Sequence, residues 1–358
     1  MTLIRHIFLS ALLLVSFLYL QAQPSPGYYN NAVGKKQKDL KTALHLIVRP
    51  HILLNYDSST SIWWNTYFKQ TDWHPNGYFW DMYSTNKRST YNGSLMNREH
   101  SMPRSWWATS SEYSLQDANG DLHNLNPSDA QANTEKSNFA LGVVGASPTF
   151  NNGVVKVGKS AYPGYSGTVF EPANEYKGDF ARCYMYMVTC YEDYATRWTS
   201  TGVTSMLSNN AYPVFKPYAI NLLMEWHRND PVSSKEINRN NAVDNIQRNR
   251  NPFIDFPVLA EYIWGEYQDE SWDGTNRELG NFYVHYNNES QKLFVNVPDP
   301  LDAAFIVYNT SGFKLLEGKP DSEGNVDVSD LPKGLYVAVV YAKGKRHAEK
   351  FLHGESYN

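Results

Sequence analysis

Cysteine is scarce in this chain of 358 residues, since only Cys183 and Cys190 occur. A fold held together by several disulfides is therefore excluded. The two cysteines lie in DFARCYMYMVTCYEDYA, which has the pattern of an amphipathic helix. At about 1.5 Å per residue, their α-carbons would lie roughly 10 Å apart, too far for a disulfide. We expect two buried thiols rather than a metal pair or a reactive nucleophile.

An excess of positive charge is also lacking, because 32 Lys and Arg face 36 Asp and Glu, for a net charge of -4 at pH 7. This excludes a protein that binds polyanions through its total charge, so binding to nucleic acid would require a local site. Aromatic residues are abundant at 15%, with 26 Tyr and 10 Trp. They suit strands, stacking surfaces and contacts to sugars or bases alike, and distinguish none of these.

The chain lacks an apolar run long enough to cross a membrane comfortably. A run from Ile7 to Leu20 follows Arg5 and His6, but a span requires about 20 apolar residues. A basic start, a short apolar run and then small and polar residues are the layout of a secretory signal peptide. We expect residues 1–23 to be cleaved and the mature chain to contain no stable membrane span.

The remaining sequence divides into two parts. Helical patterns dominate from about residue 178 to 265, whereas the aromatic, Asn- and Gly-rich residues 62–94 predict loops and short strands. A polar, glycine-containing stretch then predicts a linker. Alternating apolar and polar residues follow, which predict a small antiparallel β-sandwich module. The expected boundaries are residues 24–268 for the first domain, 269–282 for the linker and 283–354 for the module.

Two stretches predict a catalytic motif: NREHSMPRSWW at residues 97–107 and DLHNLNPSDAQANTEKSNFALG at residues 121–142. The first predicts a strand that contains His100, and DLHNL predicts a second strand. Asn126 is the expected cap of the helix that follows. Asn133 falls inside this helix, where asparagine is energetically poor. Strand, strand and helix in this order are typical of a ββα-metal finger.

The residue types suit phosphodiester hydrolysis, which requires a deprotonated water, stabilised negative charge and a protonated leaving oxygen. His100, with an ordinary pKa of about 6.5, is the expected general base. Glu99 and Asn133 are the expected metal ligands, because a carboxylate and an amide oxygen leave Mg²⁺ with several waters. These ligands do not separate Mg²⁺ from Mn²⁺ or Ca²⁺.

Strict strand alternation would place Glu99 and His100 on opposite faces. Both can serve one site only if the strand ends or bulges there, which the following Ser101-Met102-Pro103 permits. Arg98, in contrast, has the same strand parity as His100.

Other polar residues near the motif permit two interpretations each. Arg98, Arg104 and Lys136 are candidate phosphate-binding residues, with solvated charges as the alternative. Asp121 and Asn124 are candidates for orienting the general base or its water, with hydrogen bonding in turns as the alternative. Basic residues farther along could follow a nucleic-acid backbone, although a solvated helix face is the default: Lys235, Arg239, Arg248 and Arg250. Trp106 and Trp107 are expected in the core.

Four stretches resemble, in order, the blocks of the bacterial endonuclease I family of extracellular and periplasmic nucleases, which belong to the His-Me finger group. They are NREHSMPRSWW, DLHNLNPSDAQANTEKSNFALG, FEPANEYKGDFARCYMYMVTCY and WHRNDPVSSKEINRNNAVDNIQRNRNPFIDFP. The resemblance covers roughly residues 28–270. It implies an endonuclease that uses one Mg²⁺ or similar ion, with Glu99 and Asn133 on the metal and His100 as general base. It does not place the arginine that contacts the phosphate.

The C-terminal stretches VYNTSGFKLLEG, DVSDLPKGLYVAVV and KRHAEKFL are similar to the sorting domain of type IX secretion in Bacteroidetes. This resemblance implies the type IX secretion machinery as a partner, and delivery through the periplasm to the cell surface or the medium. An ordinary β-sandwich that binds sugar or the first domain is the alternative.

The sequence as a whole predicts an α+β fold, with a His-Me finger nuclease core, surrounding helices and a β-sandwich module. The expected function is that of a secreted metal-dependent endonuclease, acting on DNA and perhaps also RNA with little sequence specificity. Two alternatives remain: a surface carbohydrate-binding or adhesion protein with an inactive finger, and a metal phosphodiesterase that acts on small substrates.

Overall fold

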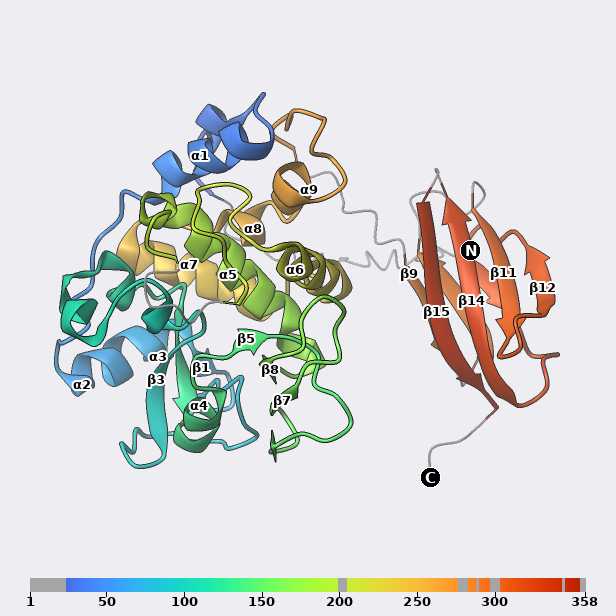
Figure 1. Ribbon diagram of the computed structural model, residues 1–358, viewed down its shortest axis with the longest axis horizontal. Coiled ribbons are helices and arrows are strands. Elements are labelled where there is room, and N and C mark those ends of the chain that lie inside the picture. Colours follow the sequence, from blue (N-terminus) through green and yellow to red (C-terminus); the bar gives the residue numbers. More distant parts are fainter. Residues whose placement is uncertain are drawn as a thin grey trace, which may run out of the picture.

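The computed structural model describes residues 24–198, 205–275, 283–287, 290–296, 303–342 and 345–354. The predicted signal peptide lies outside these residues. Within them, none of the helices combines the length and the apolarity that a membrane span requires. Helices and small sheets occur together, which confirms the predicted α+β class. The chain is described below as two units, residues 24–275 and the β-strands from residue 283 onward (Figure 1).

The first unit contains helices and short strands. Its helices are α1 (Gln37–Val48), α2 (Thr60–Ile62), α3 (Phe68–Thr71), α4 (Ala130–Lys136), α5 (Lys177–Cys190), α6 (Pro217–Asn229), α7 (Ser234–Gln247), α8 (Pro252–Asp255) and α9 (Leu259–Trp264). Its strands are β1 (Trp73–His74), β2 (Tyr78–Phe79), β3 (Met96–His100), β4 (Leu125–Asp129), β5 (Ala140–Leu141), β6 (Phe150–Asn151), β7 (Lys156–Lys159) and β8 (Thr168–Glu171).

Helix α5 forms the centre of the first unit, where it packs against α1, α6 and α8 (Figure 1). Twelve of its 14 residues are buried, so the helix is enclosed nearly all round rather than amphipathic. Cys183 and Cys190 are both buried and free, which confirms the expected thiols.

Strand β3 pairs antiparallel with β4, and α4 follows directly, so the predicted order of elements is present. The predicted boundaries were wrong, because most of DLHNL forms a turn and β4 begins only at Leu125. Asn126 therefore lies within the strand. Asp129 caps α4 instead, since its carboxylate accepts hydrogen bonds from the N–H groups of Gln131 and Ala132, both at 3.0 Å.

The prediction of only loops and short strands for residues 62–94 was also wrong. The chain is helical from Thr60 to Thr71, with a π-helix at Trp63–Tyr67 between α2 and α3. Trp63 and Trp64 are buried in an apolar cluster that also holds Val243 of α7. This tertiary burial outweighs the weak helix propensity of the aromatic residues.

The two ends of the first unit lie side by side. The Gly34 N–H donates to the Trp272 carbonyl at 2.7 Å, and the Trp272 N–H donates to the Lys35 carbonyl at 2.9 Å. The Tyr29 hydroxyl donates to Asp255 at 2.7 Å. The start and the end of the first unit are therefore joined directly by hydrogen bonds.

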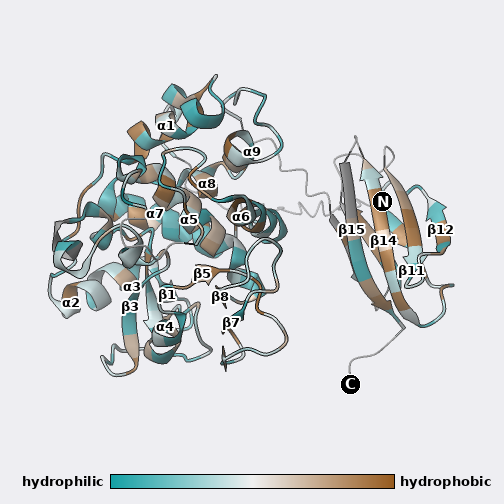
Figure 2. Ribbon diagram, in the orientation of Figure 1, coloured by the Kyte–Doolittle hydropathy of each residue, from teal (hydrophilic) through white to brown (hydrophobic). Residues whose placement is uncertain are grey.

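The second unit is built from two antiparallel sheets, with strand orders β13-β10-β9 and β12-β11-β14-β15. Its strands are β9 (Tyr283–Asn287), β10 (Lys292–Asn296), β11 (Ala304–Asn309), β12 (Lys314–Gly318), β13 (Asn325–Asp327), β14 (Gly334–Ala342) and β15 (Lys345–His353). Buried residues of both sheets form one apolar cluster, and Figure 2 shows the apolar character of β11 and β14. This cluster is separate from the two clusters of the first unit.

Candidate active site

His100 ends β3 and is only 5% exposed. Its Nε2 lies 3.0 Å from the Asn119 carbonyl oxygen. Because a carbonyl only accepts, Nε2 carries the hydrogen and Nδ1 keeps a lone pair. Burial lowers the pKa of His100 to about 3, assisted by the positive charges of Arg104, Lys136 and Arg98 and opposed by the bond to Asn119. The imidazole is therefore neutral near pH 7, in the form that can accept a proton.

Glu99 lies beside Lys136 of α4. Lys136 Nζ donates to Glu99 Oε1 at 2.6 Å and to the His100 carbonyl oxygen at 3.2 Å. Burial raises the pKa of the Glu99 carboxyl, and the Lys136 ammonium opposes that rise. Lys136 is completely buried, so its ammonium group is directed at two protein oxygens and ties α4 to the end of β3.

Asn133 lies on α4 one turn before Lys136 and is half-buried. In the described part of the chain, the Asn133 amide makes no hydrogen bond, and the Glu99 carboxylate pairs with Lys136 through Oε1. A carboxylate oxygen and an amide oxygen suit a hard cation that keeps several waters. Among the described residues, no group of three or more His, Cys, Asp or Glu side chains could hold a metal ion.

Successive side chains of β3 point to opposite faces of the strand, so Glu99 lies on one face and Arg98 and His100 on the other. The strand pairs with β4 in continuous register, without a bulge, and ends at His100. Strand termination is one of the two conditions under which Glu99 and His100 can serve one site. Arg98 and His100 both contact the ring of Tyr56, as their shared parity predicts.

Arg98 and Arg104 are both half-buried. The Arg98 guanidinium donates to the Tyr56 carbonyl at 2.6 Å, and its carbon lies 4.0 Å from the centre of the Tyr56 ring. The Arg104 guanidinium carbon lies 5.5 Å from the same ring centre. Two of the three candidate phosphate-binding residues therefore lie next to the general base candidate.

Asp121 and Asn124 make no hydrogen bond to His100 but fix the chain around it. Asp121 accepts hydrogen bonds from Tyr186 at 2.7 Å and from Tyr191 at 2.8 Å. The Asn124 amide exchanges two hydrogen bonds with the backbone of Met102, at 2.7 and 3.0 Å. These contacts hold the loop before β4 and the chain just after β3.

Asn119 is a site residue that sequence reasoning missed. It acts on His100 through its backbone carbonyl, which any residue type could supply, so the sequence carries no signal for it. Its own side-chain amide is buried and has no hydrogen-bond partner among the described residues. The same holds for Trp107 Nε1, on the ring that lies 6.2 Å from that of His100. Trp106 and Trp107 are fully buried core residues, as expected.

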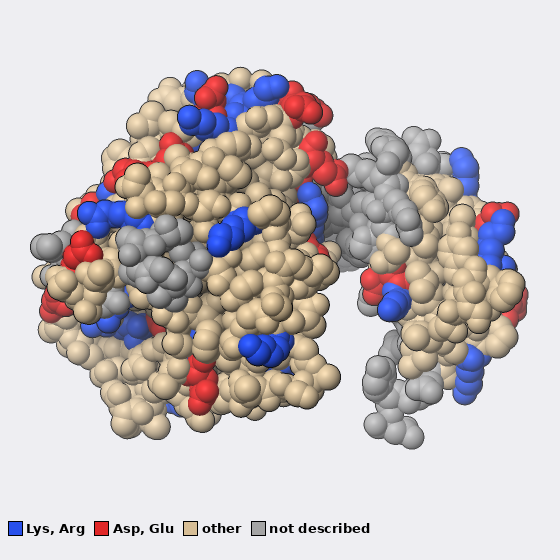
Figure 3. Space-filling view, in the orientation of Figure 1, with Lys and Arg blue, Asp and Glu red and all other residues tan. Residues whose placement is uncertain are grey.

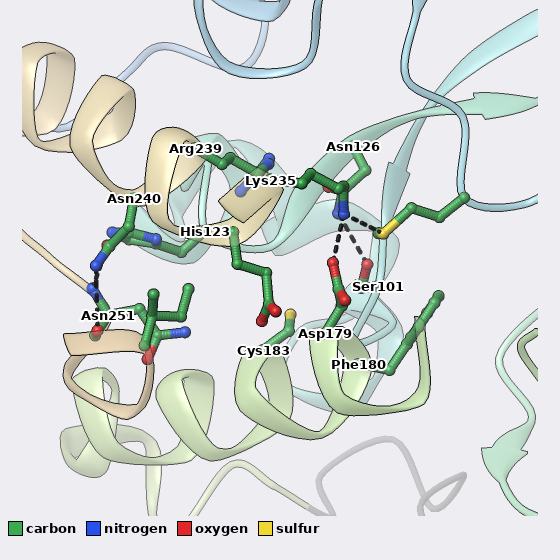
Figure 4. A pocket seen from close by; sticks show the side chains of 13 residues that line it. Ser101, His123, Asn126, Asp179, Phe180, Cys183, Lys235, Arg239, Asn240 and Asn251 are labelled. Atoms are coloured by element: carbon green, nitrogen blue, oxygen red, sulfur yellow. Dashed lines mark hydrogen bonds and ion pairs between the residues drawn. The ribbon is translucent and has the colours of Figure 1, made fainter. Parts of the chain in front are cut away.

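A small cavity of about 30 Å³ lies between the β3–β4 pair and helices α5 and α7 (Figure 4). Ser101 and Asn126 line it and bond to each other at 2.9 Å. Lys235 forms an ion pair with Asp179 there. A cavity of this size and polarity suits an ordered water.

Helix α7 has a capping box at Ser233, but most of the candidate basic residues in and just after this helix are engaged internally. Arg239 bonds Asp72 at 2.7 Å and the Leu125 carbonyl at 2.7 Å, which anchors the start of β4. Arg250 pairs with Asp255 at 2.7 Å. On the face shown in Figure 3, charged groups are scattered over a mostly uncharged surface.

The chain is similar in sequence to known proteins. The family model described as endonuclease I matches residues 36–258. The chain is 32% identical over 263 residues to an extracellular ribonuclease of Bacillus subtilis (strain 168), covering 70% of this chain and 84% of that protein. It is also 32% identical over 245 residues to an extracellular ribonuclease of Bacillus amyloliquefaciens, covering 66% of this chain and 78% of that protein. The family model and both relatives confirm the resemblance seen in the sequence: the chain belongs to the endonuclease I family.

Proposed function

We propose that the chain is a secreted, metal-dependent endonuclease that hydrolyses phosphodiester bonds in nucleic acid with little sequence specificity. His100 is the general base, and Glu99 and Asn133 hold one divalent cation, with Mg²⁺ preferred and Mn²⁺ or Ca²⁺ as alternatives. The observation that carries the proposal is a buried, neutral His100 whose Nε2 is fixed by Asn119, at the end of the strand that also contains Glu99.

Each residue has a definite task in this proposal. His100 Nδ1 takes a proton from the attacking water. Arg98 donates N–H groups to phosphate oxygens, as a planar guanidinium does well. When bound, the cation supplies positive charge where negative charge develops during the reaction. Asn119 holds the imidazole in the tautomer that accepts the proton.

The substrate proposal includes both DNA and RNA. The sequence resemblance favours DNA, whereas both relatives are named ribonucleases. Secretion is supported by the signal-peptide layout of residues 1–23 and by the extracellular relatives. The second unit lies outside the family match, and we propose that it acts as a type IX sorting domain.

The test is nicking of supercoiled plasmid and cleavage of a long RNA by the chain from residue 24 onward, with Mg²⁺ and with EDTA. We expect metal-dependent cleavage that falls by about 10²- to 10⁴-fold in His100→Ala. His74→Ala is the matched control, because His74 lies in β1, stacked on Tyr78.

Unchanged cleavage in His100→Ala would contradict the role of this residue. A folded protein that cleaves neither polymer with Mg²⁺, nor with Mn²⁺ or Ca²⁺ in its place, would favour the carbohydrate-binding alternative. Hydrolysis of a small phosphodiester without plasmid nicking would favour the phosphodiesterase alternative.

A further inference from the structure

Tyr56 lies next to the proposed catalytic residues although it is 44 positions before His100 in the sequence. It belongs to the stretch between α1 and α2, outside the motifs that predicted the site. Tyr56 is half-buried, and its ring centre lies 5.3 Å from that of His100. The ring therefore forms part of the immediate surroundings of the general base.

The backbone of Tyr56 is fixed by two hydrogen bonds. Its carbonyl oxygen accepts from the Arg98 guanidinium at 2.6 Å and from Trp63 Nε1 at 3.2 Å. Trp63 is completely buried, so the second bond ties Tyr56 to the rigid apolar cluster around α3. The ring is thereby held in one place relative to β3.

The Tyr56 ring is shared by two arginines. The guanidinium carbons of Arg98 and Arg104 lie 4.0 and 5.5 Å from its centre. The electron-rich face of an aromatic ring attracts a guanidinium and lets it stack flat. Together with the carbonyl bond, this arrangement fixes both the position and the plane of the Arg98 guanidinium beside His100.

In the described part of the chain, Arg98 makes no hydrogen bond other than the one from Nη1 to Tyr56. Its Nε and Nη2 donors therefore remain for a ligand, in a plane set by the Tyr56 ring. A guanidinium with two such donors matches the paired oxygens of a phosphate. A preset orientation lowers the ordering that binding would otherwise require.

We propose that Tyr56 is a positioning residue: its ring holds Arg98 beside His100 so that Arg98 binds a backbone phosphate of the nucleic acid next to the cleaved bond. The inference rests on the proposed function, because it requires a nucleic-acid substrate. It assigns the effect to the ring and not to the hydroxyl, which makes no hydrogen bond to a described residue.

The test measures binding of a fluorescent DNA oligonucleotide and its RNA counterpart to the His100→Ala protein, with Mg²⁺, over a range of salt concentrations. Tyr56→Leu removes the ring and keeps the carbonyl. We expect weaker binding and a salt slope reduced by about one phosphate contact, as for Arg98→Ala. The Tyr56→Leu/Arg98→Ala double variant binds no more weakly than Arg98→Ala alone, because the two residues act through one contact. Tyr56→Phe restores the wild-type slope.

Tyr78→Leu is the matched control, since Tyr78 is also half-buried, stacks on His74 at 4.3 Å and has Lys87 at 5.6 Å from its ring. Additive losses in the double variant, or an unchanged salt slope in Tyr56→Leu, would overturn the inference. If Tyr56→Leu does not fold, Arg98→Lys tests the inference instead, because lysine keeps the charge but not the planar stack on the ring. A wild-type salt slope and a wild-type affinity in Arg98→Lys would overturn the inference. Absence of cleavage by the wild-type protein would instead remove the proposed function itself.

Discussion

Asn133 lies in the middle of α4 although asparagine is a poor helix former, and its side-chain amide makes no hydrogen bond to a described residue. If Asn133 had a structural role, its side chain would make a contact that stabilises the fold. The absence of such a contact fits the proposed role of Asn133 as a metal ligand.

We therefore predict that Asn133→Ala changes the free energy of unfolding by no more than about 0.5 kcal/mol, but weakens binding of Mg²⁺ or Mn²⁺ markedly. Calorimetric titration of the metal and urea denaturation measure the two effects. Gln131→Ala, an exposed residue of the same helix, serves as control. Unchanged metal affinity, or a large loss of stability, would count against the ligand role.

At the residue scale, the sequence predicted roles for three residues from the chemistry of their side chains and from their order in the motif: Glu99, His100 and Asn133. The contact between Lys136 and Glu99 could not be predicted, because it depends on how α4 packs against β3. Asn119 contributes a backbone carbonyl and Tyr56 a ring from a distant stretch. Neither follows from a local pattern.

Helix α4 depends on Asp129 at its start. The Asp129 carboxylate caps the helix and also accepts a hydrogen bond from Arg88 at 2.6 Å. Burial opposes ionisation, but the Ala132 N–H and Arg88 outweigh it and lower the pKa of Asp129 below its ordinary 3.8. A carboxyl whose pKa is lowered by folding stabilises the folded state above its unfolded pKa, and this contribution is lost as the pH falls through the folded value.

Asp129→Ala is accordingly expected to cost about 1–3 kcal/mol of unfolding free energy at pH 7. Asp129→Asn, which keeps a capping oxygen, should cost less. The difference between the wild type and Asp129→Ala should shrink below about pH 3.8, where the carboxyl becomes protonated. Urea denaturation at pH 7 and pH 3 measures this, and a difference that grows at low pH would contradict it.

Element boundaries were less predictable than element order. Pro127 and Asn126 suggested a helix start, yet Pro127 lies in β4 opposite Arg98, where a two-stranded ladder tolerates a missing N–H. The helix at Thr60–Thr71 was missed because its stability comes from tertiary burial of Trp63 and Trp64. The helical patterns of residues 178–265 were confirmed, because α5, α6 and α7 lie there.

The whole molecule holds separate apolar clusters in its two units. A unit that buries its own core should fold without its neighbour. We predict that residues 24–275 alone unfold cooperatively at nearly the same temperature as the first unit in the full chain, and cleave nucleic acid at a similar rate. Calorimetric scanning and the nicking assay test this. Aggregation of the shortened chain, or a large drop in its transition temperature, would show that the second unit supports the first.

The contact between the two ends of the first unit suggests a circular permutation of this unit. Since Gly34 and Lys35 bond directly to Trp272, a short peptide could join residue 275 to residue 24. New termini could then be opened at an exposed turn such as the one at Gly153, between β6 and β7. In such a variant, the first unit would begin and end at the opened turn, and its present boundaries at residues 24 and 275 would be joined.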